Sequence, residues 1–195
     1  MIVAKNISKS FQKNLLFKDL SFEITQGEKV CFIAESGKGK TTLLSILMGL
    51  ESFDTGEILF DNTKLNAKNI KSLREKIAWL PQELAISIEK GEELITLLEI
   101  DKFKFENYLE KLQLSKELLL QKFQSLSGGQ KQRMLIAACL SLEKEILILD
   151  EPTSALDKTA ISILIKTIFD IENLTVISAS HNQEWINACT KIIEI

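Results

Sequence analysis

Three short, largely apolar runs, each followed by residues with helical spacing, constrain the fold of this chain more than any other feature. The runs are "KVCFIA" at 29–34, "ILIL" at 146–149 and "TVIS" at 175–178. Strands that lack a polar face need cover on both sides, and helices that alternate with such strands supply it in parallel sheets. The pattern therefore predicts an α/β fold built on a mainly parallel sheet.

The rest of the chain adds two parts to this sheet. Alternating apolar and polar residues predict strands at 2–7 and 15–24, and short strands are expected at 56–60, 77–81 and 191–195. We expect the first strands to form an N-terminal antiparallel part. Helices are predicted at about 130–143, 157–171 and 182–188. A lysine- and glutamate-rich span with leucines at helical intervals predicts a small helical subdomain at about 86–125, within a single domain 1–195 whose catalytic core is 1–85 and 126–195.

Composition excludes several classes of protein. The 24 basic and 27 acidic residues give a net charge of -3, which carries no whole-chain signal for nucleic acid or an anionic membrane surface. No nucleic-acid partner is expected. No apolar run approaches the roughly 20 residues of a membrane-spanning helix, and the N-terminus lacks a secretion signal. A protein of this kind that works at a membrane therefore needs another chain to span it. The three cysteines are widely spaced among apolar residues, which favours free buried thiols over a disulfide or a metal site.

The segment "AESGKGKTT" at 34–42 has the composition of a phosphate-binding loop between a strand and a helix. Glycines let backbone N–H groups close around phosphate oxygens, and the helix that follows presents its positive end. Ala34 stands at the usual first glycine, which is tolerable if its φ stays negative. Lys38 either tightens ATP binding or is a solvated lysine near Glu35. The residues predicted to bind ATP here are Glu35, Ser36, Gly37, Lys38, Gly39, Lys40, Thr41 and Thr42.

Two further segments carry candidate chemistry. Asp150 and Glu151 end an apolar strand, where a carboxylate can hold Mg2+ and a neighbour can orient or deprotonate water. Adjacent acids after a strand also occur as helix N-caps. Ser127, Gly128 and Gly129 open a predicted helix and form either a second anion site or a turn with a cap.

In order along the chain, "LSGGQ" at 126–130 and "ILILDEPTSALD" at 146–157 resemble the ATP-binding cassette (ABC) ATPases of the P-loop NTPase fold. Further family elements match Gln82 in "WLPQE", His181 in "SASHN" and Phe11 in "ISKSF". The resemblance extends over essentially the whole chain. It departs from the family at Ala34 and Lys38, and at Asn182, where an aspartate is common.

The resemblance implies a Mg2+-dependent ATPase in which two cassettes pack head to tail. By this resemblance Glu151 acts as general base or as the group that orients the attacking water. His181 holds the γ-phosphate, Gln82 reports its presence and Phe11 stacks on adenine. Metal contacts are implied for Thr41, Gln82 and Asp150. Contacts to the ATP of the partner subunit are implied for Ser127, Gly128, Gly129, Gln130 and Asp157.

Three functions follow from this resemblance. The leading interpretation is the ATPase subunit of a transporter, a homodimer that lies at the cytoplasmic face of the membrane and binds a transmembrane permease subunit. The second is a soluble ABC ATPase that acts on nucleic acid, ribosomes or cofactor assembly. The third is a sensing module that binds ATP without hydrolysing it, which the presence of Glu151 and His181 argues against.

Overall fold

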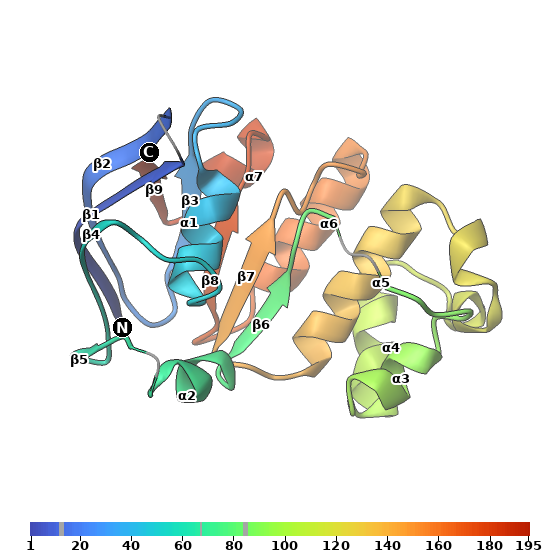
Figure 1. Cartoon of the computed structure of the whole chain (residues 1–195). Helices are drawn as coiled ribbons and strands as arrows, with labels where there is room; N and C mark the ends of the chain where they lie inside the picture. Colours follow the sequence, from blue (N-terminus) through green and yellow to red (C-terminus); the bar gives the residue numbers. More distant parts are fainter. Residues whose placement is uncertain (12–13, 67, 84–85) are drawn as a thin grey trace.

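The computed structural model describes residues 1–11, 14–66, 68–83 and 86–195 (Figure 1). Its centre is a five-stranded sheet in the order β6-β7-β8-β3-β9, in which every neighbouring pair is parallel. The strands are β6 (Ile77–Leu80), β7 (Ile146–Asp150), β8 (Thr175–Ala179), β3 (Lys29–Ile33) and β9 (Lys191–Glu194). Val30 and Phe32 are buried on one face of the sheet and Cys31 on the other. This burial on both faces explains the apolar runs, and the predicted parallel sheet is confirmed.

A second, antiparallel sheet has the order β2-β1-β4-β5. Its strands are β1 (Ile2–Phe11), β2 (Asn14–Ile24), β4 (Thr55–Phe60) and β5 (Thr63–Lys64). This sheet and helix α1 (Lys40–Leu47) share one hydrophobic core with a face of the parallel sheet. The two-residue β5 and the single-turn helix α2 (Ile70–Arg74) were not predicted, because such short elements leave no periodic pattern.

The other face of the parallel sheet is covered by α5 (Gly128–Ser141), α6 (Lys158–Phe169) and α7 (Gln183–Ala188) (Figure 1). The same core continues into the helical elements between β6 and α5. These are α3 (Glu93–Leu97), α4 (Lys102–Lys111) and the 3-10 helices η1 (Lys116–Leu120) and η2 (Phe123–Ser125). The helices predicted in this span are present, and the division of the chain into a core and a subdomain stays a prediction. None of the helices in the described ranges combines the length and apolarity that crossing a membrane requires.

One detail of α1 differs from the sequence pattern. The spacing places Leu50 on the same helix face as Leu43, Leu44 and Leu47, but the helix ends at Leu47 and Leu50 is 51% exposed. Gly49 has a φ of 62°, a left-handed conformation that commonly terminates helices. The apolar face therefore stops one turn earlier than the leucine spacing indicates.

Candidate nucleotide-binding and catalytic site

A cavity of about 580 Å³ lies where β3, β7 and β8 end. Its lining residues come from β1 and β2, the loop 34–39, the start of α1 and the segments that follow β6, β7 and β8. They are Phe11, Leu16, Ala34, Ser36, Gly37, Gly39, Lys40, Thr41, Thr42, Gln82, Asp150, Glu151, Ser154 and His181. The carboxyl ends of parallel strands therefore meet at one site, where open α/β sheets bind their ligands.

The loop between β3 and α1 has the backbone of an anion cradle. Gly37 and Gly39 have φ values of 79° and 95°, and Gly39 is the N-cap of α1. The Lys40 ammonium donates a hydrogen bond to the Ala34 carbonyl over 3.0 Å, which closes the loop across its mouth. Ala34 is not among the residues with positive φ, so its methyl group causes no backbone strain. The sequence prediction that this alanine is tolerated is confirmed.

Thr41 and Asp150 bring two oxygen donors together at the floor of the cavity. The Thr41 hydroxyl donates to Asp150 Oδ2 over 2.6 Å, and Asp150 is only 4% exposed. Burial raises the pKa of Asp150, and the charge of Glu151 adds to this rise, while the Thr41 hydrogen bond and the Lys40 charge oppose it. A hydroxyl and a buried carboxylate are hard oxygen ligands of the kind that Mg2+ prefers.

Glu151 is strained and incompletely paired. Its φ is 50°, and its buried Oε2 has no hydrogen-bond partner among the described residues. His181 Nδ1 lies 3.0 Å from this oxygen, close enough for a charge contact when the imidazole is protonated but not aligned as a hydrogen bond. A buried acceptor that faces a cavity without a donor can receive a proton from a bound water. Glu151 is therefore chemically suited to the role of general base.

Phe11 lies at the edge of the cavity with one face of its ring against a buried lysine. The Lys9 ammonium lies 4.6 Å from the ring centroid and 2.9 Å from Glu51 Oε1. Lys9 is 5% exposed, whereas Phe11 is 46% exposed. The hydrogen bond from Lys9 lowers the pKa of Glu51, which favours the ionised carboxylate. The sequence motifs gave no indication of Lys9 or Glu51, which lie 42 positions apart and meet only in the fold.

The structure brings together most of the predicted site residues of one subunit. Glu35 and Lys38 are exposed and do not line the cavity, and Lys38 forms no ion pair with Glu35. Leu16 and Ser154 line it without having been predicted. Leu16 lies 3.1 Å from the position that a Cβ on Gly39 would take, a proximity with no sequence signal. Ser154 follows the Asp150–Glu151 pair closely and shares its loop.

The residues predicted to contact the partner's nucleotide lie outside this cavity. Ser127 Oγ accepts from the Gln130 N–H over 3.2 Å, and Gln130 Oε1 accepts from the Ser127 N–H over 2.9 Å. This capping box starts α5 and confirms the cap that the sequence left as an alternative. Asp157 caps α6, and Asn182 caps α7 by accepting from the Trp185 N–H over 3.0 Å. Gly128 and Gly129 form the first turn of α5.

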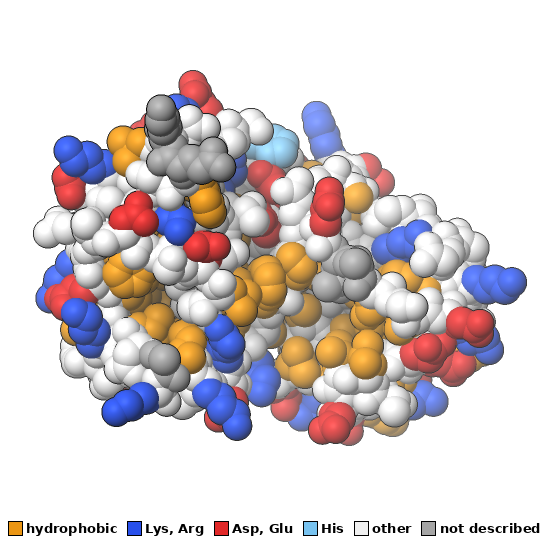
Figure 2. All heavy atoms as spheres, in the orientation of Figure 1, with side chains coloured by type: hydrophobic (Ala, Val, Ile, Leu, Met, Phe, Trp, Pro, Cys, Tyr) orange, Lys and Arg blue, Asp and Glu red, His pale blue; other side chains and the backbone are white. Residues whose placement is uncertain are grey.

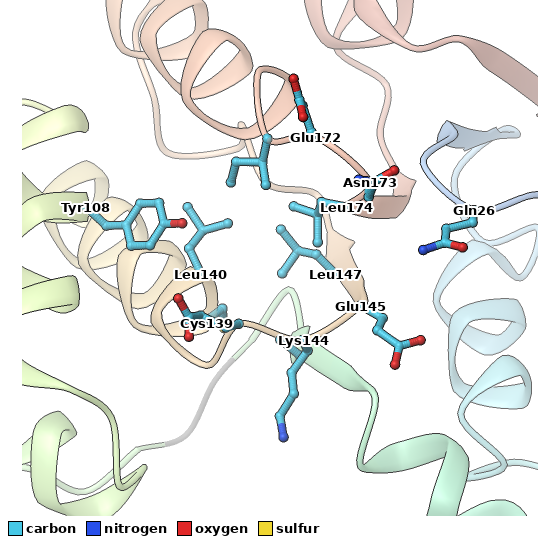
Figure 3. A pocket seen from close by; sticks show the side chains of 13 residues that line it. Gln26, Tyr108, Cys139, Leu140, Lys144, Glu145, Leu147, Glu172, Asn173 and Leu174 are labelled. Atoms are coloured by element: carbon cyan, nitrogen blue, oxygen red, sulfur yellow. The ribbon is translucent and has the colours of Figure 1, made fainter.

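A second cavity, of about 310 Å³, lies at the amino ends of β7 and β8, whereas the first lies at their carboxyl ends. Figure 3 shows its lining side chains. Leu140, Leu147 and Leu174 form its apolar wall, and Tyr108 points toward them from α4. Of its three carboxylates, Glu143 pairs with Lys104 and Glu145 pairs with Lys76, while Glu172 is exposed. The phosphate cradle and the unpartnered carboxylate both belong to the first cavity, which is therefore the candidate site.

The glycine loop between β3 and α1, with Thr41 and Asp150 at its base, defines a P-loop nucleoside triphosphatase. Residues 17–154 match the family model described as ABC transporter. The chain belongs to the ABC transporter family, as one of its ATP-binding ATPase subunits. Cassettes of this class dimerise and act together with membrane permease subunits.

Two relatives from bacteria illustrate the similarity in sequence. The chain is 34% identical over 206 residues to the energy-coupling factor transporter ATP-binding protein EcfA of Aster yellows witches'-broom phytoplasma, covering 99% of this chain and 74% of that protein. It is 36% identical over 208 residues to the phosphonates import ATP-binding protein PhnC of Fusobacterium nucleatum, covering 94% and 83%.

A solved structure shows the same similarity in three dimensions. The dimeric ATP-binding cassette MJ0796, solved in a post-hydrolysis state with ADP and Pi, superposes with a TM-score of 0.86 at 25% identity. The match covers 100% of this chain and 94% of that one. The predicted fold class and the predicted ATPase activity are thereby confirmed.

Proposed function

We propose that two copies of this chain bind ATP head to tail, with each nucleotide between the loop 34–42 of one copy and residues 126–130 of the other. This proposal rests on one observation: two helix starts suited to anion binding, those of α1 and α5, lie apart from each other in the chain. The cavity contains the start of α1, whereas Ser127 and Gly128 at the start of α5 are exposed and lie outside it. One chain thus presents half of each site, and a second copy completes both.

Within one site, each residue has a role that its surroundings support. Lys40 leaves the Ala34 carbonyl to bind the outer phosphates, and Phe11 stacks on the base. Glu151 accepts the proton of the attacking water, and the exposed His181 beside it holds the γ-phosphate. Gln82, also at the cavity wall, reports the bound phosphate to the helical elements that follow it.

Thr41 and Asp150 would hold Mg2+, with Gln82 as a further contact. The 2.6 Å hydrogen bond between the first two shows that their oxygens converge on one point, and the raised pKa of Asp150 reflects a buried charge that a cation would offset. Bound Mg2+ supplies charge neutralisation for the transferring phosphoryl group. Thr41 orients its hydroxyl for this purpose from the first turn of α1.

The membrane partner docks beside the helical elements and the segment around Gln82. In the view of Figure 2, hydrophobic side chains gather over β6 and β7, between α1 and the helical part. Trp79 of β6 is 37% exposed. An apolar surface bordered by polar residues is typical of a protein interface. We place the dimer at the inner face of the membrane, and we propose import as its direction because the PhnC relative is named as an import ATP-binding protein.

The dimer is tested with Glu151→Gln, which removes the base while preserving the shape of the side chain. With Mg2+ and ATP this variant is expected to double its mass in sedimentation, and without ATP it stays monomeric. Adding Ser127→Arg blocks the dimer but leaves the ATP dissociation constant of the monomer unchanged, because Ser127 lies outside its own cavity. A loss of monomer binding in that variant contradicts the head-to-tail arrangement.

The partner is tested by purifying tagged Glu151→Gln protein from its native cells in mild detergent with Mg2+ and ATP. Mass spectrometry is expected to identify a polytopic membrane protein among the co-purifying chains. A double variant with Trp79→Glu is the matched control and loses that protein while it retains the ATP-dependent dimer. Recovery of soluble partners alone contradicts the transporter assignment and favours the soluble ABC ATPase.

A further inference from the structure

The side chain of Gln132 clamps the loop that carries the catalytic glutamate. Gln132 lies on α5, one turn after the helix start, and both ends of its amide are used. Its Nε2 donates to the Glu151 carbonyl over 3.0 Å, and its Oε1 accepts from the Ala155 N–H over 3.1 Å. A glutamine that spans both ends of a five-residue loop fixes the loop in position and orientation.

The same loop is pressed against the start of α5. A Cβ on Gly129 would lie 2.9 Å from the Ala155 carbonyl oxygen, and a Cβ on Gly128 would lie 3.4 Å from the Ala155 Cβ. A side chain at position 129 therefore has no room unless the backbone of the loop moves. The first turn of α5 and the loop 151–155 consequently behave as one unit, joined by close packing and by the Gln132 amide.

The Gln132 amide holds the backbone of Glu151, which has an unfavourable conformation. Glu151 has a φ of 50°, a conformation that persists in a residue other than glycine only when its surroundings impose it. Its N–H donates to the Ala179 carbonyl over 2.9 Å, and its own carbonyl accepts from Gln132 Nε2 and, over 3.2 Å, from the Ser154 N–H. These bonds hold the peptide groups on both sides of the Glu151 Cα, and the Gln132 bond is the one that ties them to α5.

We propose that Gln132 is a positioning residue that aligns Glu151 for hydrolysis and couples the two ATP sites of the dimer. This inference rests on the proposed head-to-tail dimer, in which the start of α5 touches one nucleotide and Glu151 acts on the other. Gln132 bridges these two elements within one chain. A shift of the α5 start on ATP binding is transmitted to the Glu151 backbone by the Gln132 amide, alongside the packing of the α5 start on Ala155.

The test replaces Gln132 with methionine, which has a similar length and no strong hydrogen-bonding groups. We expect kcat for ATP hydrolysis to fall by about tenfold to a hundredfold, the range seen when a catalytic group is displaced by an ångström, with KM changed less than about twofold. Gln132→Leu is a second variant with a different shape. Gln124→Met, on the exposed surface of η2, is the matched control and retains wild-type kcat.

A double-mutant cycle separates positioning from general destabilisation. If Gln132 acts through Glu151, Gln132→Met causes no further loss of kcat in the Glu151→Gln background. Losses that multiply in the double variant overturn the proposal, as does a wild-type kcat in both Gln132 variants. Retention of full activity by Glu151→Gln alone, or absence of its ATP-dependent dimer, contradicts the proposed function instead, so the two failures are distinguishable.

Discussion

Replacing Asp150 with asparagine is expected to stabilise the nucleotide-free protein and to abolish its response to Mg2+ and ATP. The carboxylate is 4% exposed and adjoins the buried carboxylate of Glu151, and burial raises its pKa above the ordinary value of 3.8. An asparagine oxygen still accepts the Thr41 hydrogen bond, so the substitution removes the buried charge and preserves that contact. Relief of an uncompensated buried charge is worth about 1–3 kcal/mol, or roughly 2–12 °C in Tm for a chain of this length.

The pH dependence of this effect follows from the direction of the shift. Because the pKa of Asp150 is higher in the folded than in the unfolded state, the folded state takes up the proton first as the pH falls. As the pH falls from the raised pKa of folded Asp150 towards 3.8, the unfolding free energy of the wild-type protein therefore increases relative to that of Asp150→Asn. The difference in unfolding free energy between the two proteins is expected to be largest near neutral pH and to shrink on acidification.

Thermal unfolding followed by circular dichroism, with and without nucleotide, checks both expectations. Saturating ligand at about 100 times its dissociation constant adds about 2.7 kcal/mol to the wild-type protein, and the variant loses most of this gain with Mg2+ and ATP. The Tm advantage of the variant over the wild-type protein is then reduced by most of this gain. Asp19→Asn, at an exposed position with a φ of 51° that asparagine tolerates, is the control. A variant less stable than wild type without nucleotide refutes the reasoning.

Two further substitutions and one labelling experiment test other features. Lys9→Met removes the cation behind the Phe11 ring and is expected to weaken ATP binding about two- to tenfold, with tripolyphosphate binding unchanged in calorimetry. Gly39→Ala places a Cβ at a φ of 95° and 3.1 Å from Leu16, and is expected to lower the unfolding free energy in urea by about 1–2 kcal/mol. Burial raises the pKa of the Cys139 thiol to about 12, so mass spectrometry is expected to find it alkylated by iodoacetamide at pH 8 only after unfolding.

The sequence predicts the central sheet and the phosphate loop because both depend on local patterns. An apolar strand buried on both faces needs a continuous apolar run, and a loop that wraps phosphate needs glycines at fixed positions before a helix. Errors arise where a single residue changes the backbone. Gly49 adopts a left-handed conformation, and α1 ends before Leu50, which the leucine spacing places on the helix.

The contacts that tune the site have no local pattern. Gln132 reaches Glu151 across 19 positions, and Lys9 reaches Glu51 across 42. Such pairs depend on which elements the fold makes neighbours, which a single sequence does not specify. The sequence also does not predict the positive φ of Glu151, because glutamate has no intrinsic preference for that conformation.

Three features that weaken this fold meet at the proposed ATP site. Asp150 is a buried charge, and Glu151 combines a left-handed backbone with a buried oxygen that has no hydrogen-bond partner among the described residues. The Lys40 ammonium donates to a backbone carbonyl. The two hydrophobic cores on either side of the parallel sheet hold these groups in place without nucleotide. A ligand that offers a cation, phosphate oxygens and a water supplies the partner that each group lacks. Binding energy is therefore available at this site, and Gln132 connects it to the surface that a second copy completes in the proposed dimer.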